Sequence, residues 1–281
     1  MDQEQLKTAY QYVIPQHGIS RLMGKLAESK KTWIKNPFIN WFKNKFQVDL
    51  SEAVIQNVDD FANFNAFFTR ALKEGARPLD TEATLVSPVD GEISQIGPIK
   101  GDNVFQAKGQ KYSLNKLIGN DELAEPYQDG EFTTIYLSPK DYHRIHCPID
   151  AELKAMTYIP GQLFSVNHIT ARTIPGLFAR NERLVAHFDT QLGPMAMVLV
   201  GATIVASIET VWSGIITPPR GPAIRTWAYE PEQIQFKAGD EIARFRLGST
   251  VIITLPKGCT KWHEDLQSGS ELRMGQGIAN S

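Results

Sequence analysis

The sequence predicts an α+β fold, in which N-terminal amphipathic helices precede a mainly antiparallel β barrel or sandwich. Residues 1–75 are predicted to be helical because apolar side chains recur there three and four positions apart. From Ala83 onward, short β-branched and aromatic runs are separated by Gly, Pro, Asp and Asn, which is typical of strands and turns. Strands do not alternate with long helices, so a doubly wound parallel sheet is not expected. We therefore divide the chain into a helical region, 1–78, and a β-rich region, 79–281.

Two apolar stripes in the helical region predict amphipathic helices. The stripes consist of Ile19, Leu22, Met23 and Leu26, and of Phe38, Trp41, Phe42 and Phe46. Residues 1–50 carry eight Lys and Arg against four Asp and Glu, although the whole chain has a formal net charge of −2. Basic helices with Trp and Phe on one face are typical of a membrane interface, where each Lys or Arg contributes about 1 kcal/mol. The alternative is that both stripes pack on the body of the protein. Helical structure is expected to continue through Leu50–Phe61.

Apolar runs in the β-rich region predict strands. They span 84–86, 91–96, 132–137, 153–158, 184–188, 197–208, 234–236, 241–245 and 251–255. The run 197–208 is expected to form two strands joined at Gly201. The uncharged stretch 190–208 has the length of a membrane span, but the Gly, Pro and Gln residues in it argue against one. The last stretch, Cys259 to Ser281, is polar and Gly-rich, and we expect a mobile tail.

Composition excludes several classes of protein. With 281 residues, 42% hydrophobic and 21% charged side chains, the chain is neither disordered nor collagen-like nor a coiled coil. The nearly neutral charge argues against a nucleic-acid-binding protein. Two cysteines, Cys147 and Cys259, are too few for a disulfide framework, so we expect a reducing compartment and assign neither a role. The N-terminus lacks a secretory signal, which favours the cytosol.

The segment from Ser138 to His146 is a candidate for proton chemistry. Ser138, Pro139 and Asp141 have the spacing of a helix N-terminus, so a short helical turn is predicted there. On such a turn His143 and His146 would share one face. Two adjacent imidazoles suit proton transfer near neutral pH, or two ligands of a metal site. No further ligand lies nearby at zinc spacing, so proton transfer is favoured and no metal is expected. Both histidines could equally form structural hydrogen bonds in a polar turn.

Two further turns carry polar residues of interest. The segment Ser87–Gly91 predicts a hairpin turn in which Gly91 has a positive φ and Asp90 is a turn former. A catalytic Asp90 would need a partner, such as a histidine whose N–H it accepts. The segment Leu247–Thr250 is by itself a Gly-Ser turn between two strands. It lacks the Gly-x-Ser-x-Gly pattern of an α/β-hydrolase, which argues against ordinary serine ester hydrolysis.

Taken together, these segments resemble bacterial phosphatidylserine decarboxylases, which are self-processing pyruvoyl enzymes. The resemblance runs over nearly the whole chain, and only the tail after Pro256 is set apart. It rests on Phe64–Arg70, Leu72–Pro78, Ser87–Gly91, Tyr142–His146, Pro160–Asn167, Phe178–Arg183 and Leu247–Thr250. No one of these short motifs would suffice, but their order and spacing are specific.

The resemblance implies a particular chemistry. The chain would cut itself between Gly248 and Ser249, giving a β-subunit of residues 1–248 and an α-subunit of residues 249–281. Ser249 would become the pyruvoyl cofactor, His146 would be the base for cutting, and Asp90 would orient it. The pyruvoyl group would form an imine with phosphatidylserine, and His143 would assist its decarboxylation to phosphatidylethanolamine. The family is also expected to have a lipoyl-domain-like β core.

The expected partners follow from the same resemblance. Because the substrate stays in the bilayer, an anionic membrane surface is expected to contact Phe38, Trp41, Phe42 and Phe46. The implied location is peripheral, on the cytoplasmic face of the bacterial inner membrane. A homodimer is possible and no nucleic acid is expected. One rival hypothesis is a serine hydrolase that cleaves a lipid ester with Ser249, His146 and Asp90. Another is a non-catalytic membrane-binding module.

Overall fold

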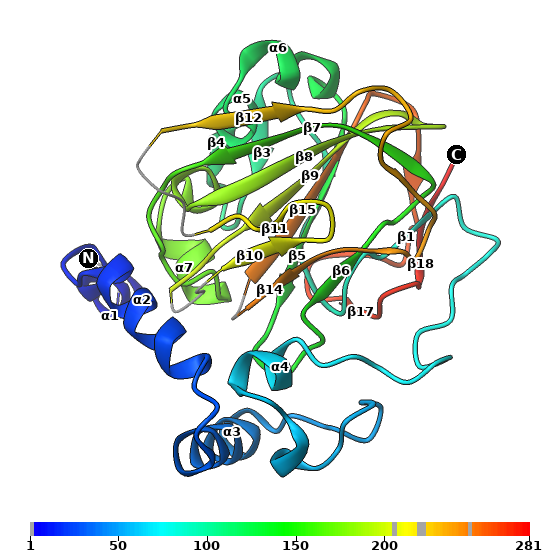
Figure 1. Cartoon of the computed structure of the whole chain (residues 1–281). Coiled ribbons are helices and arrows are strands. Elements are labelled where there is room, and N and C mark those ends of the chain that lie inside the picture. Colours follow the sequence, from blue (N-terminus) through cyan, green and yellow to red (C-terminus); the bar gives the residue numbers. More distant parts are fainter. Residues whose placement is uncertain (1–2, 204–206, 218–222, 247–248) are drawn as a thin grey trace.

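The computed structural model describes residues 3–203, 207–217, 223–246 and 249–281 (Figure 1). It combines helices with antiparallel sheets, so the predicted α+β class is confirmed. The N-terminal helices gather at one side of the molecule, and the sheets form most of the rest. Each sheet follows an open strand order through the described residues, so the closed barrel that the sequence allowed is not formed.

The N-terminal region has a small aromatic core of its own. Its helices are α1 (Gln3–Ala9), α2 (Gln16–Ala27), α3 (Thr32–Phe46) and α4 (Phe64–Phe68), with 3-10 turns at Tyr10–Tyr12 and Val58–Asp60. Phe64, Phe67 and Phe68 are at most 1% exposed and pack against α3. α3 and α4 are therefore held together by their own buried rings, whereas α1 and α2 are bonded to the β-rich region through Glu4 to Arg172 and Gln16 to Leu163.

The segment Leu50–Phe61 is not the helix that the sequence predicted. Within it, helical geometry is confined to the 3-10 turn Val58–Asp60. At its beginning the Asp49 carboxylate accepts the N–H of Ser51 at 2.8 Å. Bonds of this kind between a side chain and the nearby backbone compete with helix formation and favour turns.

The largest sheet has the strand order β12-β7-β8-β9-β15-β5-β2-β17, and β13 also pairs with β7. Its strands are β2 (Gly91–Pro98), β5 (Glu131–Leu137), β7 (Ala151–Ile159), β8 (Arg183–Thr190), β9 (Gly193–Val200), β12 (Arg225–Ala228), β13 (Gln235–Phe236), β15 (Ser249–Leu255) and β17 (Glu271–Leu272). β15 lies between β5 and β9 and is buried along its whole length. A strand covered on both faces is rich in apolar and β-branched residues, which explains why its part 251–255 could be recognised in the sequence.

A second sheet packs against the first and shares its apolar core. Its order is β11-β10-β14-β6, formed by β6 (Arg144–His146), β10 (Ile208–Thr210), β11 (Gly214–Ile215) and β14 (Glu241–Phe245). Ile145 and Phe245 of this sheet belong to the same buried cluster as Val251 and Ile253 of β15. β14 ends at Phe245 in this sheet, and β15 begins at Ser249 in the larger one.

The remaining elements cover the edges of the sheets. They are β1 (Leu85–Val86), β3 (Asn103–Phe105), β4 (Lys111–Ser113), β16 (Lys261–Trp262), β18 (Gly277–Asn280), α5 (Leu114–Ile118), α6 (Asp121–Ala124), α7 (His168–Thr173), α8 (Leu177–Arg180) and the 3-10 turn Glu125–Tyr127. α5 and α6 lie at the opposite end of the molecule from α3 and α4 (Figure 1). Among the described residues, none of the helices is long and apolar enough to cross a membrane.

Each run predicted as a strand overlaps an observed strand, and β9 ends just before Gly201 as expected. The second strand expected directly after Gly201 falls on residues that lie partly outside the described part of the chain. The prediction of a mobile C-terminal tail is wrong. β17 pairs with β2, and β18 pairs with β1 and β16. Ile278 and Ala279 are at most 1% exposed, because β18 buries them against the core. The tail is polar in composition, yet its few apolar residues find partner strands that are distant in sequence.

Candidate active site

Ser249 begins the central strand of the largest sheet. It pairs with Leu137 of β5, and the next residue, Thr250, pairs with Val200 of β9. The Ser249 side chain is fully buried, and its Oγ has no hydrogen-bond partner among the described residues. A buried hydroxyl without a partner is costly in a folded protein. Thr250 and Thr254 of the same strand share this property, and Ser249 differs from them because it begins the strand and follows Gly248 in the sequence. Gly248 lies outside the described residues.

The predicted helical turn that would carry His143 and His146 is wrong. The Asp141 carboxylate accepts the N–H of Ser138 at 2.6 Å, and the Asp141 N–H donates to the Ser138 carbonyl at 3.0 Å, which closes a tight turn. The chain then extends into β6, because β14 offers its residues a hydrogen-bonded ladder. On an extended chain, side chains three positions apart point to opposite faces. His143 and His146 therefore occupy different environments.

His143 is fully buried next to the turn. Its ring stacks on Phe68 of α4 with the centroids 4.0 Å apart, and its Nε2 lies 3.0 Å from the Ser138 carbonyl oxygen. Burial, and then the charge of Arg70, lower its pKa to about 3, so the imidazole is neutral at physiological pH. Because a carbonyl can only accept, Nε2 carries the hydrogen and Nδ1 carries the lone pair. Nδ1 has no partner in the described part of the chain.

His146 has both ring nitrogens occupied. Its Nδ1 lies 2.7 Å from the Gly239 carbonyl oxygen and donates to it, and its Nε2 lies 2.9 Å from the Tyr142 hydroxyl and accepts from it. Burial lowers the pKa of His146, although the Gly239 carbonyl and the charges of Glu241 and Asp90 oppose the effect. His146 is thus a neutral base whose lone pair is directed at Tyr142.

Asp90 is held by groups other than His146. Its carboxylate accepts the Arg77 guanidinium at 2.8 Å from Nε and 2.5 Å from Nη2, and it accepts the Met274 N–H at 2.9 Å. The Asp90 segment nevertheless runs beside β6, since the His146 N–H donates to the Pro88 carbonyl at 2.9 Å. The structure places Asp90 near His146 without a hydrogen bond between them.

The hairpin predicted at Ser87–Gly91 is also wrong. β1 pairs with β18, whereas β2 pairs with β5 and β17, so the two strands that flank this segment do not pair with each other. Gly91 does not have a positive φ. A Cβ at Gly91 would instead lie 2.5 Å from the Tyr136 carbonyl oxygen. Glycine is needed here because two backbones approach closely.

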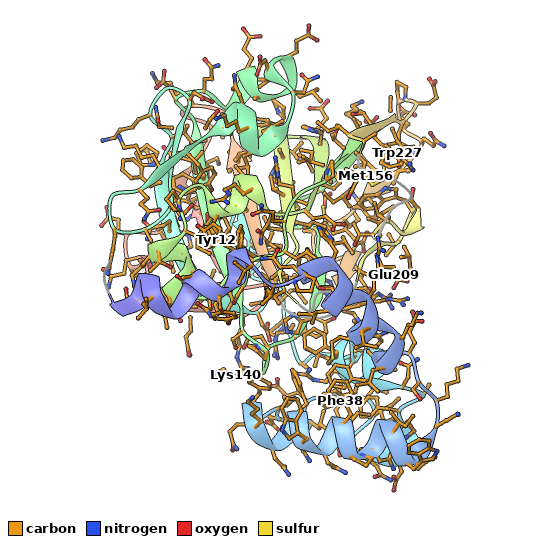
Figure 2. The ribbon with its side chains drawn as sticks, turned by 90° about the vertical axis from the view of Figure 1, so that its left-hand side faces the viewer. Tyr12, Phe38, Lys140, Met156, Glu209 and Trp227 are labelled. Atoms are coloured by element: carbon orange, nitrogen blue, oxygen red, sulfur yellow. The ribbon has the colours of Figure 1, made fainter. Side chains whose placement is uncertain are left out.

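The aromatic stripe of α3 is mostly covered. Phe42 is 6% exposed within the aromatic core, so the expectation that it contacts lipid is wrong. Phe38 stacks on Phe64 at 4.1 Å and lies on the side of α3 that faces the rest of the protein (Figure 2). Phe46 packs on Phe42 at 4.5 Å. Trp41 is 52% exposed and is the ring of this stripe that stays available.

Several site residues were not singled out from the sequence. Arg77 had entered only as part of a motif at the region boundary, and Tyr142 only as a neighbour of the histidines. Both residues line a polar cavity of about 750 Å³ beside Asp90. Phe68 was assigned to a helix alone, although its ring covers His143. No sequence signal identifies such contacts, because they join elements distant in the chain.

This arrangement indicates the class of reaction that the site can carry out. A buried serine hydroxyl begins the central strand of an antiparallel α+β protein. Two neutral imidazoles follow β5, the strand that pairs with it, and an arginine-bound carboxylate precedes β2, which pairs with β5 on the other side. These groups suit nucleophilic and proton-transfer chemistry within the chain itself. Among the described residues, no group of three or more His, Cys, Asp or Glu side chains could hold a metal ion.

Comparison with known proteins identifies the family. The family model described as phosphatidylserine decarboxylase matches residues 64–280, and a second model, described as PSD, matches residues 6–47. Proteins named phosphatidylserine decarboxylase proenzyme are similar over almost the whole chain. That of Pseudomonas fluorescens Pf0-1 is 51% identical over 99% of both chains, and that of Shewanella baltica OS155 is 52% identical over 99% of this chain and 97% of its own. That of Hahella chejuensis is 51% identical over 95% of this chain and 91% of its own.

The chain belongs to the phosphatidylserine decarboxylase family, and the resemblance seen in the sequence is confirmed. The matched region includes the C-terminal segment that the sequence analysis had set apart. This agrees with the docking of β17 and β18, and with the bond from the Met274 N–H to Asp90.

Proposed function

We propose that the chain is a proenzyme that cuts itself at Ser249 and then decarboxylates phosphatidylserine to phosphatidylethanolamine. The observation that carries this proposal is the Ser249 hydroxyl, which is buried without a partner at the start of the central strand. A serine at this place has no evident structural use, since its polar atom costs stability. The proenzyme names of the relatives agree with a chain that must be processed.

The surroundings of Ser249 fit the pyruvoyl group that cutting would create. Ser138 follows Leu137, the strand partner of Ser249, and its Oγ is also buried without a partner in the described residues. His143 is bonded to the same Ser138 through Nε2 and leaves Nδ1 unused. The unused hydroxyl and lone pair belong to Ser138 and to its bonding partner His143, and we infer that they bond polar atoms of the new group. When formed, the pyruvoyl group supplies a carbonyl that holds the substrate amine and accepts the electrons released with carbon dioxide.

Cutting requires that a base activate the Ser249 hydroxyl for attack on the preceding carbonyl. We assign this role to His146, with Asp90 as the carboxylate that favours its protonated form. Asp90 lies close enough for its charge to raise the pKa of His146, and Arg77 holds it in place. In the uncut chain the His146 lone pair is occupied by Tyr142, so that hydroxyl must either relay the proton or move aside.

We assign His143 to the decarboxylation step. Its Nδ1 lone pair would first take up a proton from the substrate or from water, and would then pass that proton to the carbon that carbon dioxide leaves. Support comes from its fixed tautomer, its stacking on Phe68, and its bond to the residue that follows the partner of Ser249. A neutral imidazole that is held on both sides has little freedom to turn away from this position.

Intact mass and carbon dioxide release test these assignments. The wild-type chain should separate under denaturing conditions into two fragments that meet at residues 248 and 249, and Ser249→Ala should remain uncut and inactive. His146→Ala and Asp90→Asn should slow cutting, whereas His143→Ala should cut but release little carbon dioxide from carboxyl-labelled phosphatidylserine. A single full-length chain that turns over a lipid ester would instead favour the serine hydrolase. Cut protein that releases no carbon dioxide would favour the non-catalytic membrane module.

We further propose that the N-terminal helices bring the enzyme to an anionic membrane. Support comes from large apolar side chains that remain exposed on α2 and α3, namely Leu22 at 69%, Trp33 at 73% and Trp41 at 52%. Lys45 lies 4.8 Å from the ring of Trp41, an arrangement suited to an interface with anionic lipid. The separate apolar cores agree with a division near residue 78. A homodimer, a lipoyl-like core and a location at the cytoplasmic face of the inner membrane stay predictions.

A further inference from the structure

A second cavity shares none of its lining residues with the cavity beside Asp90. It has a volume of about 310 Å³ and is enclosed between α2, α4 and one end of the largest sheet. Its walls include Asn65 of α4, Glu182 just before β8, Gly201 just after β9, and Arg246 just after β14. α2 runs past the end of β10 here, where Glu209 lies (Figure 2). None of the roles assigned above uses these side chains.

The strand register places Glu182 in one row with Ser249. Arg183 pairs with Val200, and the Gly201 N–H donates to the Glu182 carbonyl at 2.8 Å, so Glu182 is opposite Gly201. Thr250 also pairs with Val200, so continuing that register by one residue puts Ser249 beside Gly201. Residues directly opposite one another in antiparallel strands project to the same face. With neighbouring strands about 4.8 Å apart, the Cα atoms of Glu182 and Ser249 are about 10 Å apart.

Gly201 stands in the middle of the row and contributes no side chain of its own. A Cβ at this position would lie 3.2 Å from the Glu182 carbonyl oxygen and 3.6 Å from Leu163 Cδ2. Leu163 therefore covers Gly201, and together with Gly201 and Glu182 it lines the cavity.

Three polar side chains of this cavity have unused acceptor atoms. Glu182 Oε1, Asn65 Oδ1 and Ser207 Oγ are all buried, and none has a hydrogen-bond partner in the described ranges. Glu182 as a whole is 5% exposed. An ammonium group carries three N–H donors and no acceptor, so it matches such a set. The buried carboxylate adds the opposite charge that an ammonium requires.

The rim of the same cavity is positively charged. Arg21 and Lys25 of α2 line it, and no described acidic side chain forms an ion pair with either of them. Arg246 also lines it, but is engaged by Glu209 at 2.9 Å and Glu28 at 3.5 Å. Unpaired cations beside a buried carboxylate suit a ligand that joins an ammonium to an anionic phosphate.

We propose that this cavity receives the phosphoserine head group, and that Glu182 binds its ammonium and removes the proton that must leave before the nitrogen can react. The proposal rests on the function proposed above and names the residue that binds the substrate amine. In this step one N–H bond breaks, its electron pair stays on nitrogen, and an O–H bond forms on the Glu182 carboxylate. Arg21 and Lys25 contact the phosphate.

The electrostatics of Glu182 agree with this role. Burial raises its pKa to about 7, and a hydrogen bond from Tyr158 and the charge of Arg21 oppose the rise. A carboxyl group that titrates near neutral pH can both accept and return a proton. The other charged or titratable groups that face the cavity are His17, Lys25, Glu28 and Arg246.

Binding of the soluble head group tests the proposal apart from turnover. Glycerophosphoserine and glycerol 3-phosphate, which lacks the amine, are titrated calorimetrically into the uncut Ser249→Ala chain with and without Glu182→Gln. Glu182→Gln should weaken glycerophosphoserine binding at least about tenfold, because a hydrogen bond to a charged group is lost. Binding of glycerol 3-phosphate should not change. Equal binding of glycerophosphoserine to both chains would overturn the proposal.

The processed enzyme gives a second readout. By intact mass, Glu182→Gln in the otherwise wild-type chain should cut to completion. Its kcat/KM for phosphatidylserine should fall at least about tenfold, and the increase of kcat/KM with pH near 7 should be lost. Failure of cutting would place Glu182 in the processing step and refute the assignment. Wild-type protein that releases no carbon dioxide would refute the proposed function, whereas active wild-type with an equally active Glu182→Gln would refute this inference alone.

Two further variants serve as controls. Glu131→Gln changes a carboxyl whose pKa burial also raises, but it lies opposite Leu255, about 20 Å along β15 from Ser249. It should leave binding and kcat/KM unchanged. If Glu182→Gln does not fold, Ser207→Ala removes one acceptor with little change in volume. It should weaken glycerophosphoserine binding a few-fold without affecting glycerol 3-phosphate, and no change in either would count against the site.

Discussion

The buried ion pair between Arg77 and Asp90 is expected to be a major support of both the fold and the cutting site. The two side chains are 8% and 12% exposed, and the carboxylate accepts the guanidinium at 2.8 and 2.5 Å. The bond to Asp90 is the main cause of the raised pKa of Arg77. Arg77→Gln would leave the carboxylate buried with the Met274 N–H as its other protein donor. Removing one partner of a buried pair costs about 3–5 kcal/mol.

The free energy of unfolding in urea measures this loss. The Ser249→Ala background keeps the chain in one piece, so that cutting does not complicate the transition. Lys237→Gln is a matched control, because Lys237 bonds Asp150 at 2.7 Å with side chains 80% and 56% exposed. An exposed pair contributes about 0–1 kcal/mol. The reasoning would be refuted if Arg77→Gln cost less than about 1 kcal/mol, no more than its control. In the cutting-competent chain, Arg77→Gln should also slow processing by intact mass.

Further predictions concern acid stability, backbone packing and the membrane. His143 protonates below about pH 6.5 in the unfolded chain but only near pH 3 in the folded chain. Acid therefore favours unfolding between these values. From pH 7 to pH 4, His143→Gln should lose up to about 3 kcal/mol less stability than the wild-type chain. Identical acid unfolding of the two chains would contradict the burial argument. Gly91→Ala should cost about 1–3 kcal/mol, because its Cβ would meet a carbonyl of β5. Gly18→Ala has room in α2 and should stabilise by about 0.5–1 kcal/mol, and unfolding curves check both. Replacing Trp33 and Trp41 by Ser should weaken binding to anionic vesicles at least about tenfold while cutting stays complete, and unchanged sedimentation with vesicles would remove these rings from the membrane contact.

The strands could be predicted because their signal is local. β9 and the part of β15 from Val251 onward are rich in apolar and β-branched residues, which a buried strand favours whichever strands it pairs with. The helical turn at Ser138–His146 failed for the opposite reason. Its capping pattern was real, but the Asp141 side chain closed a tighter turn and β14 supplied a ladder for the residues that follow. A competing partner that is distant in sequence decided the local conformation.

The sequence by itself determined the family, the α+β class and the buried strands, since these follow from the type, order and spacing of residues along the chain. The roles of Ser249, His146 and Asp90 rest on the resemblance and are proposals. Only the tertiary structure decided that Asp90 bonds Arg77 and the C-terminal segment, that Phe68 covers His143, and that Glu182 stands in one row with Ser249. Each of these facts depends on which strands become neighbours. The charge, tautomer and accessibility of a side chain are set by atoms that fold against it, and those atoms come from elsewhere in the chain.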